Sequence, residues 1–116
     1  MTAARLRLGA VGEDRAAAWY RAEGYSIIER NWRCRDGEID LICAQGRTLV
    51  VCEVKTRSSL AYGHPAEAVT PTKQRRIRGL AARWLAEADV PFRPDGIRFD
   101  VAAVLPGEVD VIQAAF

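Results

Sequence analysis

The spacing of hydrophobic residues changes several times along the chain, and these changes indicate where helices and strands begin and end. The alanine-rich stretch 5–23 ends at Gly24, a residue that commonly terminates a helix, which predicts a helix there. A second helix is predicted to begin after Thr70-Pro71 and to run to about residue 88, because proline favours the first helical position. Its apolar residues recur at helical spacing: they are Ile77, Leu80, Ala81, Trp84, Leu85 and Ala88.

The remaining segments show the β-branched, alternating pattern of strands, separated by turn signals that contain glycine. The predicted strands are 25–32, 38–44, 48–55, 97–105 and 109–114. A loop is expected between the third strand and the second helix. The resulting order is αβββαββ, without repeat or linker, which indicates one α/β domain over residues 1–116.

Composition narrows the class of protein further. The chain has 116 residues, of which 49% are hydrophobic and 28% charged, as expected of a domain with its own core and not of a disordered or fibrous chain. No stretch approaches the ~18 consecutive apolar residues of a membrane span, and no secretory signal is visible. We therefore expect a cytoplasmic protein with no membrane partner.

Cysteine usage agrees with a reducing compartment, because three cysteines do not form a disulfide framework in a chain this short. Cys34, Cys43 and Cys52 would need further ligands to close a four-ligand zinc site, and His64 is the sole histidine. We therefore do not expect structural zinc.

Charge is distributed unevenly, although the formal net charge is only +2. Between Glu67 and Glu87 there is no other acid, while the segment contains Lys73, Arg75, Arg76, Arg78 and Arg83. A domain polarised in this way can present a basic face to phosphates. The alternative is an ordinary solvated helix face.

Two predicted strands carry acids close together. The second reads Glu38-Ile39-Asp40 and the third Glu53-Val54-Lys55, and side chains two apart on a strand share a face. The short turn between them indicates an antiparallel hairpin. A register that places Asp40 opposite Glu53, or opposite Val51, gathers all four charged residues on one face, whereas a shift by one residue separates the pairs. The hydrophobic pattern leaves both registers open.

Carboxylates inside an apolar hairpin need a partner, because an unpaired buried charge is disfavoured by several kcal/mol or more. One lysine cannot neutralise two or three acids, whereas a divalent cation can. Mg²⁺ accepts one or two carboxylates and keeps waters, which leaves room for a phosphate and a nucleophilic water. The alternative is a cross-strand salt bridge without a metal, which is a common feature of sheets.

The segments Gly37–Ile42 (GEIDLI), Val50–Arg57 (VVCEVKTR) and Ala66–Ile77 (AEAVTPTKQRRI) together resemble the YraN family of small bacterial proteins. That family belongs to the PD-(D/E)XK nuclease superfamily and is similar to archaeal Holliday-junction resolvases. The resemblance extends from the GxxGE stretch at 9–13 to the RFDV stretch at 98–101. It implies a restriction-endonuclease-like mixed sheet of about five strands, flanked by helices.

The resemblance also implies roles for individual residues. Asp40 and Glu53 would be the two metal-binding acids and Lys55 the motif lysine. Glu13 matches an acid on the first helix that often reaches the metal, and Gln74 matches a glutamine of resolvase-like members. Ile39 departs from the proline of the superfamily's name, at a position that tolerates other residues. The alternatives are that Glu13 is a surface acid and that Gln74 is a polar residue at a helix start.

The function implied is a Mg²⁺- or Mn²⁺-dependent endonuclease that cleaves DNA, with branched DNA as the expected substrate and a homodimer as the expected state for paired cuts. The expected contacts to the DNA backbone are Arg57, Lys73, Arg75, Arg76 and Arg78. Two alternatives remain: a non-catalytic nucleic-acid-binding module on the same scaffold, and a partner-binding protein in DNA uptake or repair.

Two further residues and one loop have simpler interpretations. We interpret Asp100 as structural and paired with Arg98, two residues earlier on the same face. Glu38 is interpreted as a charge at the outer edge of the sheet. The loop 56–69, which contains Tyr62 and His64, is expected to border the site.

Overall fold

The computed structural model describes residues 3–59 and 69–116, with side chains from residue 10 onward in these ranges. Two helices and five strands follow one another in the predicted order αβββαββ. They are α1 (Ala3–Ala22), β1 (Ser26–Cys34), β2 (Gly37–Gln45), β3 (Thr48–Thr56), α2 (Pro71–Glu87), β4 (Gly96–Leu105) and β5 (Glu108–Ile112).

The five strands form one mixed sheet, with the spatial order β1-β2-β3-β4-β5. The β1–β2, β2–β3 and β4–β5 pairs are antiparallel, whereas β3 and β4 are parallel. Parallel neighbours need a crossover connection, and α2 supplies it between β3 and β4. The α/β class and the mixed five-stranded sheet flanked by helices are thus confirmed.

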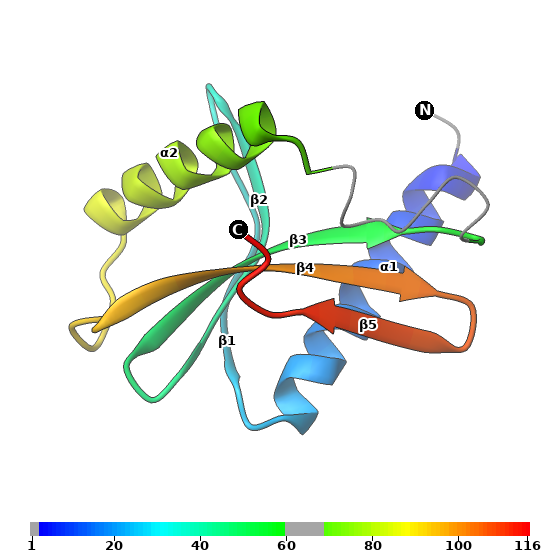
Figure 1. The fold of residues 1–116 in the computed structure, drawn as a ribbon, viewed down its shortest axis with the longest axis horizontal. Helices are drawn as coiled ribbons and strands as arrows, with labels where there is room; N and C mark the ends of the chain where they lie inside the picture. Colours follow the sequence, from blue (N-terminus) through cyan, green and yellow to red (C-terminus); the bar gives the residue numbers. More distant parts are fainter. Residues whose placement is uncertain (1–2, 60–68) are drawn as a thin grey trace.

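The two helices cover opposite faces of the sheet (Figure 1). Under α2, Ile77 and Trp84 pack with Leu49 and Val51 of β3 in one apolar core. Under α1, a second core includes Val50 and Cys52 of the same strand; it also contains Ala16, Ala17 and Tyr20 of α1. Both faces of β3 are therefore buried.

A polar cluster is enclosed within the α1 face. Asp100 has no exposed surface, and its carboxylate accepts hydrogen bonds from the Tyr20 hydroxyl (2.7 Å) and the Arg98 guanidinium (2.8 and 2.9 Å). Arg98 also donates to the Tyr25 hydroxyl (3.0 Å). The structural interpretation of Asp100, paired with Arg98, is confirmed.

The ends of the elements follow their local chemistry, although some differ from the prediction by one or two residues: β1 continues to Cys34, beyond the predicted 32. The Thr70 hydroxyl caps α2 by accepting from the backbone N–H of Lys73 (3.3 Å), and Pro71 begins the helix. The last strand ends at Ile112, before the predicted 114. Ala114 has a positive φ of 50°, and its N–H donates to Asp100 (3.0 Å), so the chain turns towards β4 there.

No helix among the described residues combines the length and the apolar character that crossing a lipid bilayer would require.

Candidate functional site at the fork between β2 and β3

The β2–β3 hairpin has the register that brings Asp40 and Glu53 to the same end of the ladder. Leu41 pairs with Cys52 and Ile42 with Val51, so Asp40 and Glu53 are the next residues along the two strands. Gln45 pairs with Thr48, and the two-residue turn between them contains Gly46 with a φ of 60°. Such a tight turn fixes the register of a hairpin, which answers the question that the hydrophobic pattern left open.

Beyond Leu41 and Cys52 the two strands separate, and the side chain of Asp40 lies in the fork. The last pair of the β2–β3 ladder is Leu41 with Cys52. One step further, the backbone N–H of Val54 donates to Oδ2 of Asp40 at 2.8 Å instead of to a strand carbonyl. This bond anchors the Asp40 carboxylate between the two strands.

The surroundings of Asp40 disfavour its charged form. Burial raises the pKa of Asp40 to about 7, and the negative charge of Glu53 adds to this shift. The Val54 hydrogen bond opposes the shift, while Glu13 and Glu38 add to it. Four carboxylates thus interact electrostatically at the fork.

Lys55 offsets one of these acids. Its Nζ lies 3.2 Å from Oε1 of Glu53, and each of the two side chains is 21% exposed. Glu53 and Lys55 continue the row of Leu49 and Val51 along the α2 side of β3. The lysine therefore stands beside the acidic pair, as the sequence predicts, and is engaged with Glu53.

Glu13 approaches the fork from the other face because α1 packs closely on the end of β3. A Cβ on the buried Gly12 would overlap the side-chain oxygen of Thr56, so only glycine allows this approach. Glu13 follows directly, is half-buried, and acts electrostatically on Asp40. The structure brings Glu13, Asp40, Glu53 and Lys55 to one end of the hairpin.

Glu38 is nearer to the site than its interpretation as an edge charge suggested. It is exposed and pairs with Arg33 (3.1 Å), yet it also raises the pKa of Asp40 and lines the adjoining cavity. The sequence contained the signal for this, because Glu38 lies two residues before Asp40 on the same strand.

Gln74 lies elsewhere in this structure. Its side-chain nitrogen donates to the backbone carbonyl of Val69 at 3.1 Å. It thereby satisfies a carbonyl just before α2, and Gln74 is not among the residues that line the cavity with Glu53. As placed here, Gln74 acts at the helix start, which was the alternative interpretation.

The basic side chains of α2 divide into two sets. Lys73 and Arg76 line a cavity of about 270 Å³ together with Glu53 and Lys55. The other set is engaged outside the cavity. Arg75 donates to the Thr72 hydroxyl (3.3 Å), Arg78 lies over the rings of Phe99 (4.7 Å) and Phe116 (5.5 Å), and Arg83 pairs with Asp36 and Glu87 (3.0 and 3.1 Å).

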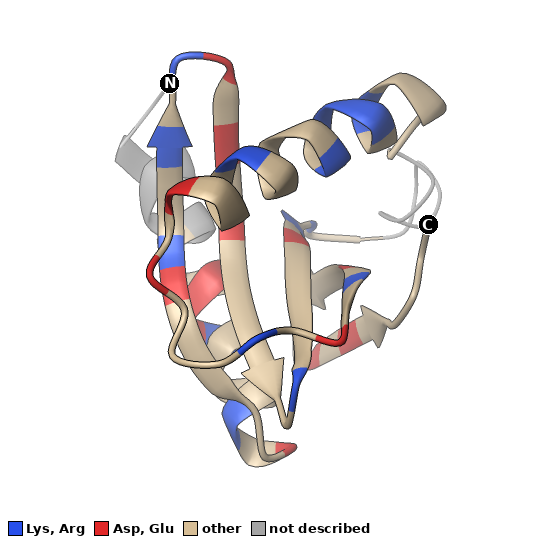
Figure 2. Cartoon of the chain, turned by 90° about the vertical axis from the view of Figure 1, so that its left-hand side faces the viewer, with Lys and Arg blue, Asp and Glu red and all other residues tan. Residues whose placement is uncertain are grey.

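Figure 2 shows basic segments along α2, which crosses the sheet near acidic segments of the strands. Arg57, just after β3, is exposed, and its backbone N–H donates to the carbonyl of Val104 (2.9 Å). Of the five predicted DNA contacts, Lys73 and Arg76 are therefore the two that line a cavity together with Glu53.

The cysteines do not share one place. Cys34 packs against the core under α2, whereas Cys43 and Cys52 belong to the core under α1. Burial raises the pKa of the Cys43 thiol to about 12.

Tyr62 and His64 lie outside the described residues. Within the described ranges, no group of three or more His, Cys, Asp or Glu side chains is gathered as a metal site.

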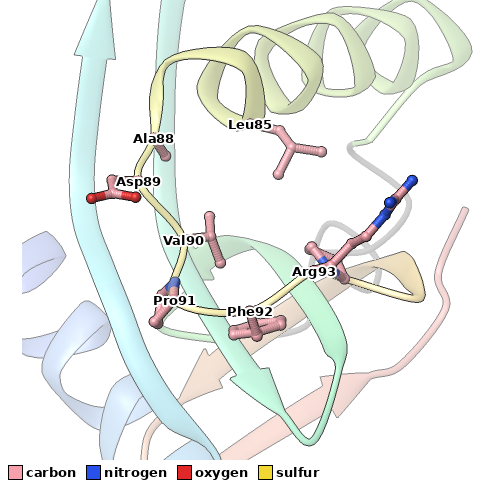
Figure 3. A pocket seen from close by; sticks show the side chains of 8 residues that line it. Leu85, Ala88, Asp89, Val90, Pro91, Phe92 and Arg93 are labelled. Atoms are coloured by element: carbon pink, nitrogen blue, oxygen red, sulfur yellow. The ribbon is translucent and has the colours of Figure 1, made fainter.

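A larger cavity of about 500 Å³ lies where α2 leads into β4, and Leu85, Val90 and Phe92 are among its lining residues (Figure 3). It contains one acid, Asp89, and one cation, Arg93, whose side chains extend to opposite sides in this view. Charged groups do not converge in this cavity, which distinguishes it from the strand fork.

The fold and the fork define a small α/β protein that carries an acidic site on a β-hairpin between two covering helices. The model of the family described as "Uncharacterised protein family UPF0102" matches residues 12–104. The chain belongs to this family, which confirms the YraN family expected from the sequence motifs.

Relatives of this chain cover nearly its whole length. A protein of Beutenbergia cavernae is 59% identical over 102 residues, which cover 88% of this chain and 85% of the relative. One of Frankia casuarinae is 51% identical over 118 residues and covers 97% of this chain and 98% of the relative. Both are described as UPF0102 proteins.

Proposed function

We propose that this protein is a metal-dependent endonuclease of the PD-(D/E)XK superfamily that hydrolyses phosphodiester bonds of DNA with Mg²⁺ or Mn²⁺. The observation that carries the proposal is the fork itself: Asp40 lies where β2 and β3 separate, Glu53 acts electrostatically on it, and Lys55 contacts Glu53 at 3.2 Å. The sequence resemblance to the YraN family supports the same assignment.

The donor set at the fork fits a hard divalent cation. Mg²⁺ is commonly held by one or two carboxylates, with waters and substrate phosphate oxygens as its other ligands. Asp40 and Glu53 would hold the ion, with Glu13 as a third candidate ligand. An excess of acids agrees with this. Burial, together with the charge of Glu53, raises the pKa of Asp40 to about 7, and among the described carboxylates Lys55 forms a salt bridge with Glu53 only.

When bound, the ion supplies a Lewis acid that polarises a phosphate oxygen and lowers the pKa of a coordinated water. The chain's own groups do the rest. Lys55 orients the attacking water by a hydrogen bond and stabilises negative charge that grows on the phosphate. Glu53 holds Lys55 in place. The water oxygen bonds to phosphorus and gives up a proton to the solvent, while one phosphorus–oxygen bond of the strand breaks and the leaving oxygen takes up a proton from the solvent.

Substrate binding is assigned to α2 and the end of β3. Lys73 and Arg76 border the cavity beside the acids, where they would contact phosphates. Such contacts position a nucleic acid without reading its sequence. We extend the proposal to branched DNA as substrate, with a homodimer when two strands are cut.

The second candidate function is a nucleic-acid-binding module without catalysis. The cations of α2 favour it, because they do not depend on the acidic pair. It predicts binding with a steep salt dependence and no cleavage in either metal.

The test is a cleavage screen on linear, nicked, flapped and four-way DNA with Mg²⁺ and Mn²⁺. Glu53→Gln and Lys55→Met are expected to lower the rate by about 10²–10³-fold, because each removes a group that acts on the reacting phosphate. Glu108→Gln is the matched control, since Glu108 is exposed at the start of β5. Equal rates for Glu53→Gln and the parent would contradict the mechanism.

A further inference from the structure

The cavity beside the acidic pair is distinct from the fork that holds Asp40. It has a volume of about 270 Å³ and is bounded by α2 on one side and by the separated ends of β2 and β3 on the other. Glu53 and Lys55 belong to both the cavity and the fork, whereas Asp40 is not part of the lining. A molecule in the cavity would therefore lie next to the proposed cleavage position.

The cavity offers two cations that the described residues leave without an acidic partner. Lys55 is paired with Glu53, and Arg83 of the same helix is paired with Asp36 and Glu87. No carboxylate within the described residues forms a salt bridge with Lys73 or Arg76, and both side chains are exposed. Two such cations on adjacent turns of a helix are suited to a phosphate group.

The helix wall of the same cavity is apolar where the largely buried Ile77 and Leu80 reach its surface. Gly37 allows Leu80 to lie there, because a Cβ on this glycine would approach Leu80 Cδ1 to 3.1 Å. A free phosphate would gain nothing from this wall. A phosphate joined to a sugar and a base would cover it.

The volume limits the size of the ligand. Pockets for drug-sized molecules range over about 300–1,000 Å³, so a cavity of about 270 Å³ suits a single nucleotide unit. A nucleotide paired and stacked within a duplex cannot enter such a space without leaving the stack, which is unfavourable.

We propose that this cavity is a nucleotide subsite that takes one unpaired nucleotide of a DNA strand. Lys73 and Arg76 bind its phosphate, and Ile77 and Leu80 contact its nucleoside. For its place beside the cleaved bond the inference rests on the proposed nuclease function. It adds the expectation that a strand is cut next to an unpaired nucleotide, as found at a flap or a branch.

The binding test uses thymidine 5′-monophosphate, inorganic phosphate and thymidine as separate probes, titrated into the whole chain in EDTA and followed by NMR. Thymidine 5′-monophosphate is expected to bind about ten-fold more tightly than either fragment, with shifts at residues of the cavity. Arg76→Ala is expected to weaken this binding about ten-fold, as for the loss of a charge-assisted hydrogen bond. Arg21→Ala, an exposed arginine on the other helix, changes it less than two-fold.

Equal affinity for phosphate and for thymidine 5′-monophosphate would overturn the subsite, as would equal losses in Arg76→Ala and Arg21→Ala or the absence of binding. A cleavage assay on flapped and fully paired DNA separates the two proposals. Nucleotide binding without any cleavage leaves the subsite and removes the nuclease. Cleavage that ignores pairing, without nucleotide binding, leaves the nuclease and removes the subsite.

Discussion

Two aspartates of the same sheet, Asp100 on β4 and Asp40 on β2, occupy very different surroundings. Asp100 has no exposed surface. Its carboxylate accepts four hydrogen bonds, from the Tyr20 hydroxyl, two nitrogens of Arg98 and the backbone N–H of Ala114, at 2.7–3.0 Å. The positive charge of Arg98 offsets its negative charge within the fold.

Asp40 is half-buried and has neighbours of its own sign. Val54 donates one backbone hydrogen bond to it, while Glu53, Glu13 and Glu38 raise its pKa in addition to burial. The nearby lysine is bound to Glu53. The contrast shows that the same side chain can be neutralised by the fold or left to be neutralised from outside. The first aspartate has a structural role, and the second is the residue for which we propose metal binding.

The largest expected effect on stability comes from removing Asp100 from the cluster that it forms with Tyr20 and Arg98. Asp100→Ala removes a fully buried carboxylate that accepts four hydrogen bonds and pairs with the partly buried Arg98. Removing one member of a buried ion pair typically destabilises a protein by about 3–5 kcal/mol. Urea denaturation measures the loss. If the free energy of unfolding decreases by less than about 1 kcal/mol, Arg98 and Tyr20 find other partners. The structural role of Asp100 would then be contradicted.

Asp40→Asn is expected to increase the stability of the metal-free protein, in contrast to Asp100→Ala. The raised pKa of Asp40, about 7 against an ordinary 3.8, means that the folded protein binds more protons than the unfolded chain between about pH 4 and pH 7. The free energy of unfolding therefore decreases as pH rises through this window. Asparagine has no charge there and still offers an oxygen to Val54.

We therefore expect Asp40→Asn to stabilise the metal-free protein by roughly 1–3 kcal/mol at pH 8 while abolishing cleavage. Denaturation at pH 4, 6 and 8 tests this, because the difference from the parent should nearly vanish at pH 4. A variant that is less stable than the parent at pH 8 would contradict the account.

Lys55→Met is expected to change stability only slightly while it removes activity. The Lys55–Glu53 pair is partly exposed, with each side chain at 21%, and such pairs contribute at most about 1 kcal/mol. We expect a melting temperature within a few degrees of the parent together with the loss of cleavage. If stability falls by several kcal/mol instead, the lysine belongs to the fold and not to the site.

The smallest effect is expected for Glu38→Gln. Glu38 is exposed and already paired with Arg33, and its influence on Asp40 comes after those of burial, Glu53 and Glu13. NMR titration of the Asp40 carboxyl should show a decrease in its pKa of less than about one unit. An increase would mean that Glu38 acts on Asp40 through some route other than its charge.

Local patterns in the sequence predicted most of the fold. The threonine cap, the proline and the apolar stripe located α2, and glycine turns located the strand ends. The hairpin register did not follow from the apolar pattern, because both faces of β3 are buried and either register hides the same residues. The short turn around Gly46 decides it.

Local patterns in the sequence also predicted part of the candidate site. The positions of Asp40, Glu53 and Lys55 on two strands joined by a short turn predicted that these residues lie close together, as they do in the structure. Contacts between distant segments could not be read in this way. The aromatic rings over which Arg78 lies include Phe116, 38 positions away in the sequence, and Tyr20 reaches Asp100 across 80 positions.

The most direct measurement of the central claim is the titration of the Asp40 carboxyl by NMR, with and without Mg²⁺ and without DNA. We expect a pKa near 7 for the metal-free protein and a clear decrease when Mg²⁺ is added, because the cation favours the ionised carboxylate. An ordinary acidic pKa in both samples would show that the fold already neutralises Asp40 and would contradict the account.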